Sequence, residues 1–525
     1  MRIILYAFSV VLLSSCTLSD SNIFDDVITS YQQDSQKQKA AIYLKEHSKY
    51  HYGVIRKIHN VDDAIQVVEN AENDSICRHH LDSIGCKILT ESIIWDKDAL
   101  TKEYIYKNIE LAFDSWRNPW SRSVSFDDFC KYILPYRNGD EELHDWRKYF
   151  KDKYEAAITD SVSDPTSIKE VAVFLIKQLR KEIAYGPRMG VFSRKMLTTS
   201  NMEVLHWMDC MGCAHYVTLA MRACGIPCTM ITNYWRFTEV PHTTVLFPAV
   251  GNNKNAFRLT IGDEFMEMTE PKDTMAVWYC WSRSYEANPD LLELLDDYET
   301  SGHKYEALKN FALPVTREDV TPLMSTTYDF SLPVPDSLRN RHHLFLCRFH
   351  NWKWYPIRAG KVIEDSVLFK NASIRQWYRL GYADADSVKT FGGTFTLVGD
   401  SGMARSHKKD IIRPYDLSGD TVLFKMVYGC DKEEKHLTRE ITTYYWNGRD
   451  DWHPYTQKAV LWGFNEQNSE YKIFDESLRG TFKPVFHLLQ VRLPKWTVFT
   501  DNETPRPLGY LFTDKETGEG CFMQF

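Results

Sequence analysis

Apolar residues recur at three- and four-residue spacing along the first third of the chain, with charged residues between them. The pattern is clearest over residues 38–47, 61–73, 99–116, 127–134 and 167–183. This spacing places the apolar side chains on one face of a helix. The sequence therefore predicts an all-helical domain over residues 31–166.

The period of the pattern changes from about residue 167 onward. An apolar helix over residues 210–223 is followed by short runs rich in β-branched residues, bounded by Gly and Asn, at residues 227–232, 243–247 and 256–261. A helix followed by antiparallel strands is typical of an α+β arrangement. We place this core at residues 167–325.

Beyond residue 330 nearly every segment has the pattern of a short strand between turn residues. Examples lie at residues 343–349, 367–369, 393–398, 421–428, 441–446 and 459–464. So many short strands fit two β-sandwich-like modules better than one, and we place these at residues 335–420 and 421–525. The expected fold is multidomain α+β, with an N-terminal helical region, a central α+β core and C-terminal β-sandwich-like modules.

The first fifteen residues carry a targeting pattern. Met1-Arg2 gives a short positive start, residues 3–13 are apolar, and Leu13-Ser14-Ser15-Cys16 follows. An apolar run of this length is too short to span a bilayer. The tetrapeptide resembles a bacterial lipobox, which implies cleavage before Cys16 and a membrane anchor through lipid on its thiol; an ordinary cleaved signal peptide is the alternative. Residues 16–30 are the expected tether.

Composition narrows the possible functions. The chain has 525 residues, 43% of them hydrophobic and 26% charged, with a net charge of −8. These values are typical of a folded protein with several domains. No basic stripe is present, so nucleic acid is not an expected partner. The cysteines are scattered, and a Cys77–Cys86 or Cys224–Cys228 disulfide is left open.

Cys210 is the first candidate for chemistry, because it stands where the helix over residues 210–223 begins. Gly225 and Pro227 supply the stop at the other end of this helix. The partial positive charge of the first helical turn stabilises a thiolate, which suits a nucleophile. A cysteine near a helix start is also a common structural residue.

A base for this nucleophile is available at His242, which begins a strand. A turn near residues 251–253 folds residues 256–261 back against that strand. Counting outward from the turn places His242 opposite residues near 262, so either Asp263 or Glu264 is the candidate to orient its imidazole. A thiol on a helix start, an imidazole on a strand and a carboxylate on the next strand is the arrangement that a cysteine triad needs.

The spacing around Cys210 resembles the transglutaminase-like core, a member of the papain-like cysteine enzyme superfamily. Ala214 four residues on, Arg222 twelve on and Gly225-Ile226-Pro227 from fifteen on match the family pattern. His242 and a later acid follow in the family's order. The resemblance implies cysteine-dependent acyl transfer on amide or peptide bonds, most often hydrolysis, through a Cys-His-Asp/Glu triad.

The sequence departs from that pattern in two places. Thr244 stands where the family usually has an aromatic residue, two positions after the His, and the interval from the His to the acid is longer than typical. An inactive transglutaminase-like lipoprotein that binds peptide or glycan is therefore the alternative function.

The flanks resemble large transglutaminase-like lipoproteins of Bacteroidetes, at residues 125–137 with Trp146-Arg147 and at residues 40–44 ahead of His51-Tyr52. The resemblance implies a helical leader, β-rich domains after the core and a cell-envelope location, lipid-anchored to the outer membrane on its periplasmic or surface face. The expected partners are a peptide, protein or glycopeptide substrate and the membrane. No motif calls for a cofactor or a metal.

Four other residue groups are weighed as candidate sites. Trp207 and Trp235 are substrate-binding candidates that either line the cleft or pack in the core. His215, one turn after Cys210, either contacts substrate or packs beside the site. A zinc site is disfavoured because the two close cysteine pairs would lie about 20 Å apart along one helix. His342 and His343 have no acidic partner at ligand spacing, which predicts solvated positions.

Overall fold

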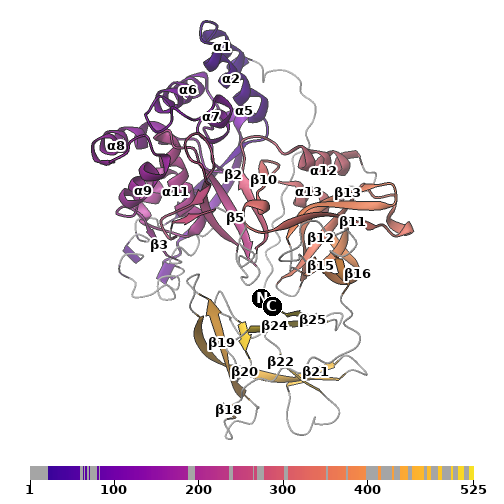
Figure 1. Cartoon of the computed structure of the whole chain (residues 1–525). Coiled ribbons are helices and arrows are strands. Elements are labelled where there is room, and N and C mark those ends of the chain that lie inside the picture. The colour runs from indigo at the N-terminus through magenta and orange to yellow at the C-terminus, as the bar shows by residue number, and fades with distance from the viewer. Residues whose placement is uncertain are drawn as a thin grey trace. The chain divides into compact units, whose positions relative to one another are not determined.

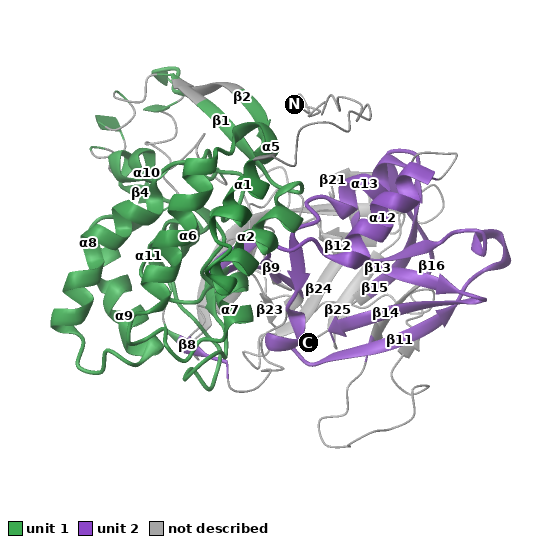
Figure 2. Ribbon diagram, turned by 90° about the horizontal axis from the view of Figure 1, so that it is seen from above, with its two compact units in different colours: residues 1–229, 245–265 green, residues 230–244, 266–525 purple. Residues whose placement is uncertain are grey.

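The structure is a computed structural model of the whole chain. It describes residues 22–59, 63, 66–67, 70, 80–81, 83–186, 195–235, 241–263, 265–268, 277–300, 305–350, 353–373 and 377–397, and the backbone of strands between residues 412 and 524. The leader, Cys16 and Glu264 lie outside the described residues. The chain divides into two compact units. The first contains residues 1–229 and 245–265, and the second contains residues 230–244 and 266–525 (Figure 2).

The fold is mixed α+β, as the sequence predicts (Figure 1). Up to the central sheet the elements are α1 (Asn22–Ser30), α2 (Ser35–Ser48), β1 (Tyr52–His59), β2 (Lys87–Trp95), α5 (Asp96–Ala99), α6 (Lys102–Trp116), α7 (Phe126–Tyr132), α8 (Trp146–Ser161), α9 (Ile168–Leu179), β3 (Ala184–Tyr185), α10 (Thr199–Leu205), β4 (Trp207–Met208) and α11 (Cys210–Ala223).

The following elements are β5 (Thr229–Trp235), β6 (His242–Phe247), β7 (Phe257–Arg258), β8 (Met266–Glu267), β9 (Val277–Arg283), α12 (Pro289–Thr300), α13 (Glu306–Ala312), β10 (Arg317–Asp319) and β11 (Thr327–Pro333). The remaining strands are β12 (His343–His350), β13 (Lys353–Ile363), β14 (Ser366–Ser373), β15 (Trp377–Asp384), β16 (Ser387–Leu397), β17 (Ile412–Pro414), β18 (Gly429–Cys430), β19 (Thr438–Trp446), β20 (Trp452–Asn465), β21 (Glu470–Ile473), β22 (Lys483–Phe486), β23 (Val498–Thr500), β24 (Pro507–Thr513) and β25 (Gly520–Gln524).

Four of the five predicted N-terminal helices are confirmed as α2, α6, α7 and α9; the fifth, residues 61–73, lies largely outside the described residues. Each of the four begins after a side chain that accepts a backbone N–H of the first turn, namely Asp34, Thr101, Ser125 and Ser167. Such caps contribute about 1 kcal/mol each. The same unit contains α8, which the sequence analysis missed.

The prediction that residues 31–166 are all helical is wrong at one place. β1 and β2 pair as an antiparallel ladder, from Tyr52 opposite Trp95 to His59 opposite Lys87. The physical reason lies in the second strand, where Ile88, Ile93 and Ile94 are β-branched and favour extended backbone.

α11 is the central helix of its unit. Every residue from Gly212 to Ala223 is buried, so this helix is enclosed on all sides rather than amphipathic. α8 packs against it, and Phe150 of α8 lies edge-on to Tyr216 of α11. The buried residues Trp146, Phe150, Tyr154 and Ile158 of α8 form a stripe with a spacing of four residues.

A six-stranded sheet has the order β10-β9-β5-β6-β7-β8. β6 and β7 pair antiparallel, with Leu246 opposite Arg258 and Phe247 opposite Phe257. This is the register that the count from the turn predicts. β7 is shorter than the predicted run at residues 256–261, because the chain turns after it, with the Asp263 N–H donating to Thr260 O at 3.4 Å.

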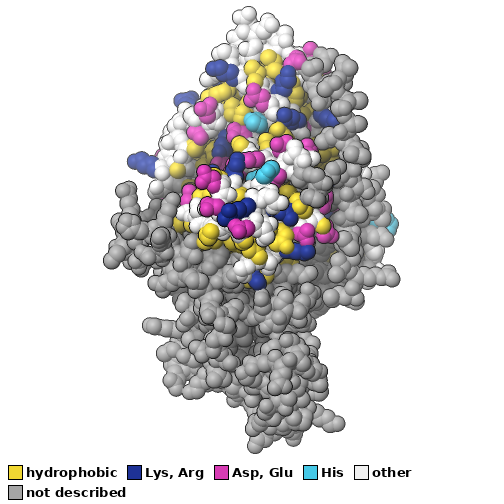
Figure 3. All heavy atoms as spheres, turned by 90° about the vertical axis from the view of Figure 1, so that its right-hand side faces the viewer, with side chains coloured by type: hydrophobic (Ala, Val, Ile, Leu, Met, Phe, Trp, Pro, Cys, Tyr) yellow, Lys and Arg dark blue, Asp and Glu magenta, His cyan; other side chains and the backbone are white. Residues whose placement is uncertain are grey.

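The rest of the chain is rich in strands, as predicted. One sheet has the order β11-β14-β13-β12-β15-β16-β17, and another has the order β21-β20-β19-β23-β24-β25 with β18 and β22 beside it. The predicted strand at residues 421–428 lies outside the described residues. On the face shown in Figure 3, acidic and basic side chains are interspersed over the described atoms. None of the described helices is long and apolar enough to cross a bilayer.

Candidate functional site

Cys210 is the first residue of α11, where the sequence predicts it. Asp209 caps the helix: its Oδ1 accepts the Gly212 N–H at 2.9 Å, and its carbonyl oxygen accepts the Cys213 N–H at 2.9 Å. The backbone N–H groups of Cys210 and Met211 have no hydrogen-bond partner among the described residues. Free amides at a helix start are donors suited to a developing oxyanion.

Cys210 differs from the other cysteines whose side chains the structure describes, because it alone among them is partly exposed. Burial, with the negative charges of Asp209 and Asp263, raises the pKa of Cys213. Burial also raises the pKa of Cys224, and that of Cys228 to about 12. These neighbours stay protonated at neutral pH, so a soluble electrophile meets one accessible thiol in this helix. Cys224 and Cys228 are free, so the disulfide left open between them is not formed.

The strand that leads into Cys210 is held by close backbone packing. β3 and β4 pair in parallel, and the Gly186 N–H donates to Met208 O at 3.0 Å. A Cβ on Gly186 would lie 2.8 Å from the Trp207 ring, and one on Gly212 would lie 2.9 Å from the Met208 sulfur. Trp207 is partly exposed three residues before Cys210, so it remains a candidate wall of the site.

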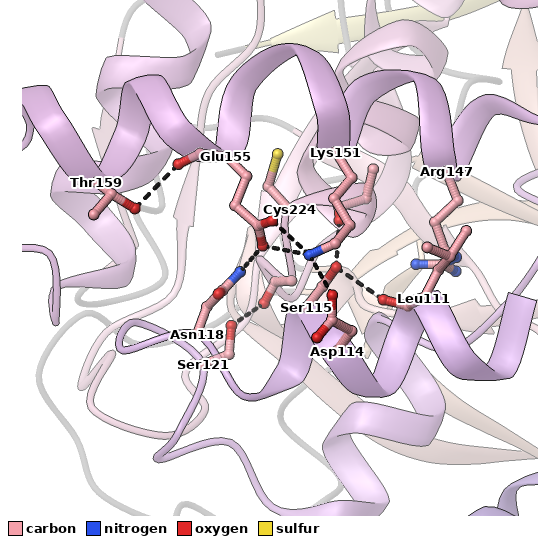
Figure 4. A network of polar contacts seen from close by, with 12 residues as sticks. Leu111, Asp114, Ser115, Asn118, Ser121, Arg147, Lys151, Glu155, Thr159 and Cys224 are labelled. Atoms are coloured by element: carbon pink, nitrogen blue, oxygen red, sulfur yellow. Dashed lines mark hydrogen bonds and ion pairs between the residues drawn. The ribbon is translucent and has the colours of Figure 1, made fainter.

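The other end of α11 is anchored by carbonyl-directed hydrogen bonds, part of which Figure 4 shows. Ser115 Oγ donates to Ala223 O at 2.6 Å, and Trp120 Nε1 donates to Cys224 O at 2.7 Å. Gly225 follows with φ at +78°, a conformation that favours glycine. This Schellman-like ending fixes the axial position of the helix that carries Cys210.

Arg222, twelve residues after Cys210, has a structural role in this helix. It is buried, and its guanidinium donates to Arg137 O at 3.2 Å and to Cys228 O at 3.3 Å. Arg147, equally buried, donates to Arg222 O at 3.0 Å. Both guanidinium groups bind backbone carbonyls, so they hold the chain around α11 and do not face a ligand.

His215 is completely buried, which favours the packing interpretation over the substrate-contact prediction. Its Nδ1 lies 3.1 Å from the Asn138 side-chain amide nitrogen, and its Nε2 lies 3.2 Å from Leu197 O. Glu141, nearby, accepts the N–H groups of Asn138 and Gly139 at 2.7 Å each. Burial alone would raise the pKa of Glu141, but the charges of His215 and Arg137 and the backbone N–H groups lower it to about 2.

Asp263 lies in the turn after β7 and is partly exposed. Arg180, which the sequence analysis missed, fixes this turn: its Nη2 donates to Asp263 O at 2.6 Å and to Thr260 O at 3.0 Å, and its Nε donates to Ile261 O at 3.0 Å. The charge of Asp263 contributes to the raised pKa of Cys213, so this carboxylate acts on the start of α11.

Trp207, Cys210, His215 and Asp263 belong to the first compact unit. His242 and Trp235 belong to the second; His242 is the first residue of β6 and is partly exposed, and only the backbone of Trp235 is described.

His342 and His343 bind an acid that the sequence spacing did not suggest. Their Nδ1 atoms lie 2.8 Å and 2.9 Å from the two carboxylate oxygens of Asp297 in α12. The prediction of solvated positions is right for His342, whose side chain is 74% exposed, and wrong for His343, at 6%.

No protein-family model matches the chain, and no curated protein matches it in sequence.

Proposed function

We propose that the chain catalyses acyl transfer on amide or peptide bonds, most often with water as the acceptor, in a transglutaminase-like core. Cys210 is the nucleophile, His242 its base, and Asp263 or Glu264 the acid that orients the imidazole. The observation that carries the proposal is a partly exposed thiol on the first residue of a buried, capped helix, beside two backbone amides with no partner among the described residues.

The reaction follows from the chemistry of these groups. The Cys210 thiolate attacks the carbonyl carbon, and the amides at the start of α11 stabilise the negative charge on the carbonyl oxygen. The carbon–nitrogen bond then breaks, and the imidazolium of His242 gives its proton to the leaving amine. Water, activated by the neutral imidazole, hydrolyses the thioester and frees the thiol; an amine in place of water forms a crosslink.

The lipid anchor and the substrate class belong to the same proposal. Lipid on Cys16 would hold the protein at the outer membrane, and peptides, proteins or glycopeptides of the envelope would be its substrates. A second candidate function is binding of peptide or glycan without chemistry. Thr244 favours it, because a buried threonine replaces the family's aromatic residue two positions after the His.

The test is the rate of iodoacetamide labelling at Cys210 between pH 5 and 9, located by mass spectrometry, in the wild type and in His242→Ala. Fast labelling at pH 6 that falls tenfold or more in the variant supports the thiolate–imidazole pair. Cys213→Ala is the matched control, because it removes a buried thiol of the same helix and leaves the rate unchanged. Slow labelling with the same profile in wild type and His242→Ala would favour the binding function.

A further inference from the structure

Two buried polar side chains lie on the strands around His242. Asn233 in β5 is completely buried, and neither its Oδ1 nor its Nδ2 has a hydrogen-bond partner among the described residues. Thr244 in β6 is also completely buried, and its Oγ1 has no such partner. Leaving a buried amide without hydrogen bonds costs roughly 1–3 kcal/mol of folding free energy, so we expect each of these groups to find a hydrogen-bond partner.

Asn233 and His242 lie on neighbouring strands of the six-stranded sheet. β5 and β6 are neighbours in the sheet, and the Oγ1 atoms of Thr232 and Thr243 lie 3.2 Å apart. Cross-strand side chains that close to each other share one face, so Asn233 and His242, each one residue away from that pair, face the opposite side of the sheet. Thr244, two residues after His242 in the same strand, shares that side.

The other cross-strand neighbour of Asn233 does not satisfy its amide. On β9 the residue opposite Asn233 is Cys280, which is completely buried. A thiol is a weak donor and a weak acceptor, whereas an imidazole has a strong N–H donor. In the structure neither atom of the Asn233 amide is hydrogen-bonded to the His242 ring. Directly opposed cross-strand side chains have Cβ atoms about 4.5–5.5 Å apart, a span that a change in the side-chain torsions of Asn233 can bridge.

We infer that Asn233 is a positioning residue for His242, with its Oδ1 accepting a ring N–H and its Nδ2 donating to Thr244 Oγ1; as a role in catalysis, this rests on the proposed function of His242 as the base. The two hydrogen bonds satisfy the amide and the hydroxyl together. They fix one tautomer and direct the unprotonated nitrogen away from the sheet. Thr244, the departure from the family pattern, then holds the Asn233 amide, and Asn233 is an alternative to Asp263 or Glu264 as the group that orients the imidazole in the proposed function.

The experiment reads the ring of His242 directly in the full-length chain. The protein is labelled with ¹⁵N-histidine, the His242 signals are assigned by their loss in His242→Gln, and the ring nitrogens are compared in the wild type, Asn233→Leu and Asp263→Asn. Thr232→Val is the matched control, because it removes a buried polar group from the same strand on the opposite face.

The wild type is expected to show one protonated and one unprotonated ring nitrogen. Asn233→Leu is expected to move both signals toward the average of two exchanging tautomers and to slow iodoacetamide labelling of Cys210 by roughly three- to tenfold. Thr232→Val leaves the signals in place. Asn233→Asp, close in shape, keeps an acceptor and holds the ring doubly protonated to higher pH, so it serves if the leucine variant does not fold.

Unchanged His242 signals in both Asn233 variants would overturn the inference and indicate that a buried water binds the amide. Averaged signals in Asp263→Asn alone would return the role to the carboxylate. If Cys210 is unreactive in the wild type, the proposed function fails, but the nitrogen signals still decide whether Asn233 holds the ring.

Discussion

Substitution of Gly225 by alanine tests whether the anchored end of α11 is as constrained as its geometry implies. Gly225 has φ at +78°, and a Cβ there would lie 2.3 Å from Ser115 O and 2.8 Å from Ser121 Oγ. Ser121 Oγ also donates to Gly225 O. The added methyl group therefore meets backbone on one side and an anchoring hydroxyl on the other, and neither can move without loosening the helix end.

Replacing Gly225 with alanine has two costs, the left-handed backbone and the steric clash, and a substitution at Gly85 measures the first cost alone. A left-handed conformation costs an alanine about 1–2 kcal/mol, and forcing atoms into a packed interior costs about 1–3 kcal/mol more. Gly85 has φ at +68° and nothing within 4 Å of a built Cβ, so Gly85→Ala carries the backbone cost alone. We expect Gly225→Ala to lose about 4 kcal/mol and Gly85→Ala about 1 kcal/mol. The gain from a less flexible unfolded chain applies to both and cancels.

Calorimetric melting of the full chain measures both variants. The transition of the unit that contains α11 is expected to fall by about 10 °C in Gly225→Ala and by about 3 °C in Gly85→Ala. Labelling of Cys210 is expected to change in the first variant only, because α11 joins Gly225 to the nucleophile. Equal melting shifts in the two variants would refute the reasoning, since the contacts of Gly225 would then contribute nothing beyond its dihedral angles.

Three further predictions concern charge and accessibility. The pKa of Glu141 is lowered to about 2, so its carboxylate stabilises the fold above the ordinary glutamate pKa, and this contribution is lost as the pH falls toward 2. In Glu141→Gln, the free energy of unfolding should therefore fall by about 3 kcal/mol less than in the wild type when the pH is lowered from neutral to 2. Asp297→Asn weakens the hydrogen bond to buried His343, so we expect denaturant unfolding to show a loss of about 1–2 kcal/mol in the free energy of unfolding. His342 is exposed, so His342→Gln should lower that free energy by under about 0.5 kcal/mol. One equivalent of N-ethylmaleimide should modify Cys210 before any other described cysteine of the native chain, and peptide mapping that finds a buried cysteine modified first would contradict this.

The start of α11 could be predicted from sequence because its signals are local. Asp209 caps the helix, and Gly225 ends it, both within two residues of the segment itself. The register of β6 with β7 was also predictable, because a short turn fixes which residues face each other. Signals of this kind need no knowledge of the rest of the fold.

The residues that the sequence analysis missed have partners far along the chain. Arg180 binds Asp263 O across 83 residues, and His343 binds Asp297 across 46. Asn233 carries no motif at all, and it became a candidate only because the structure shows its amide buried without a partner among the described residues, on the strand next to that of His242. Spacing rules cannot find such pairs, because tertiary packing and not chain distance brings them together.

The family pattern itself consists of two kinds of residue. Arg222 and Gly225 hold the end of α11 through carbonyl contacts and a left-handed turn, so the helix needs them whether or not Cys210 reacts. A chain that had lost its chemistry would keep both, because losing them would cost the fold several kcal/mol. The match to the pattern therefore reflects the packing at the end of α11 and carries little weight for catalysis. Whether the protein is an enzyme depends on Cys210, His242 and the groups that hold the imidazole, and the labelling rate of the Cys210 thiol is the measurement that tests it.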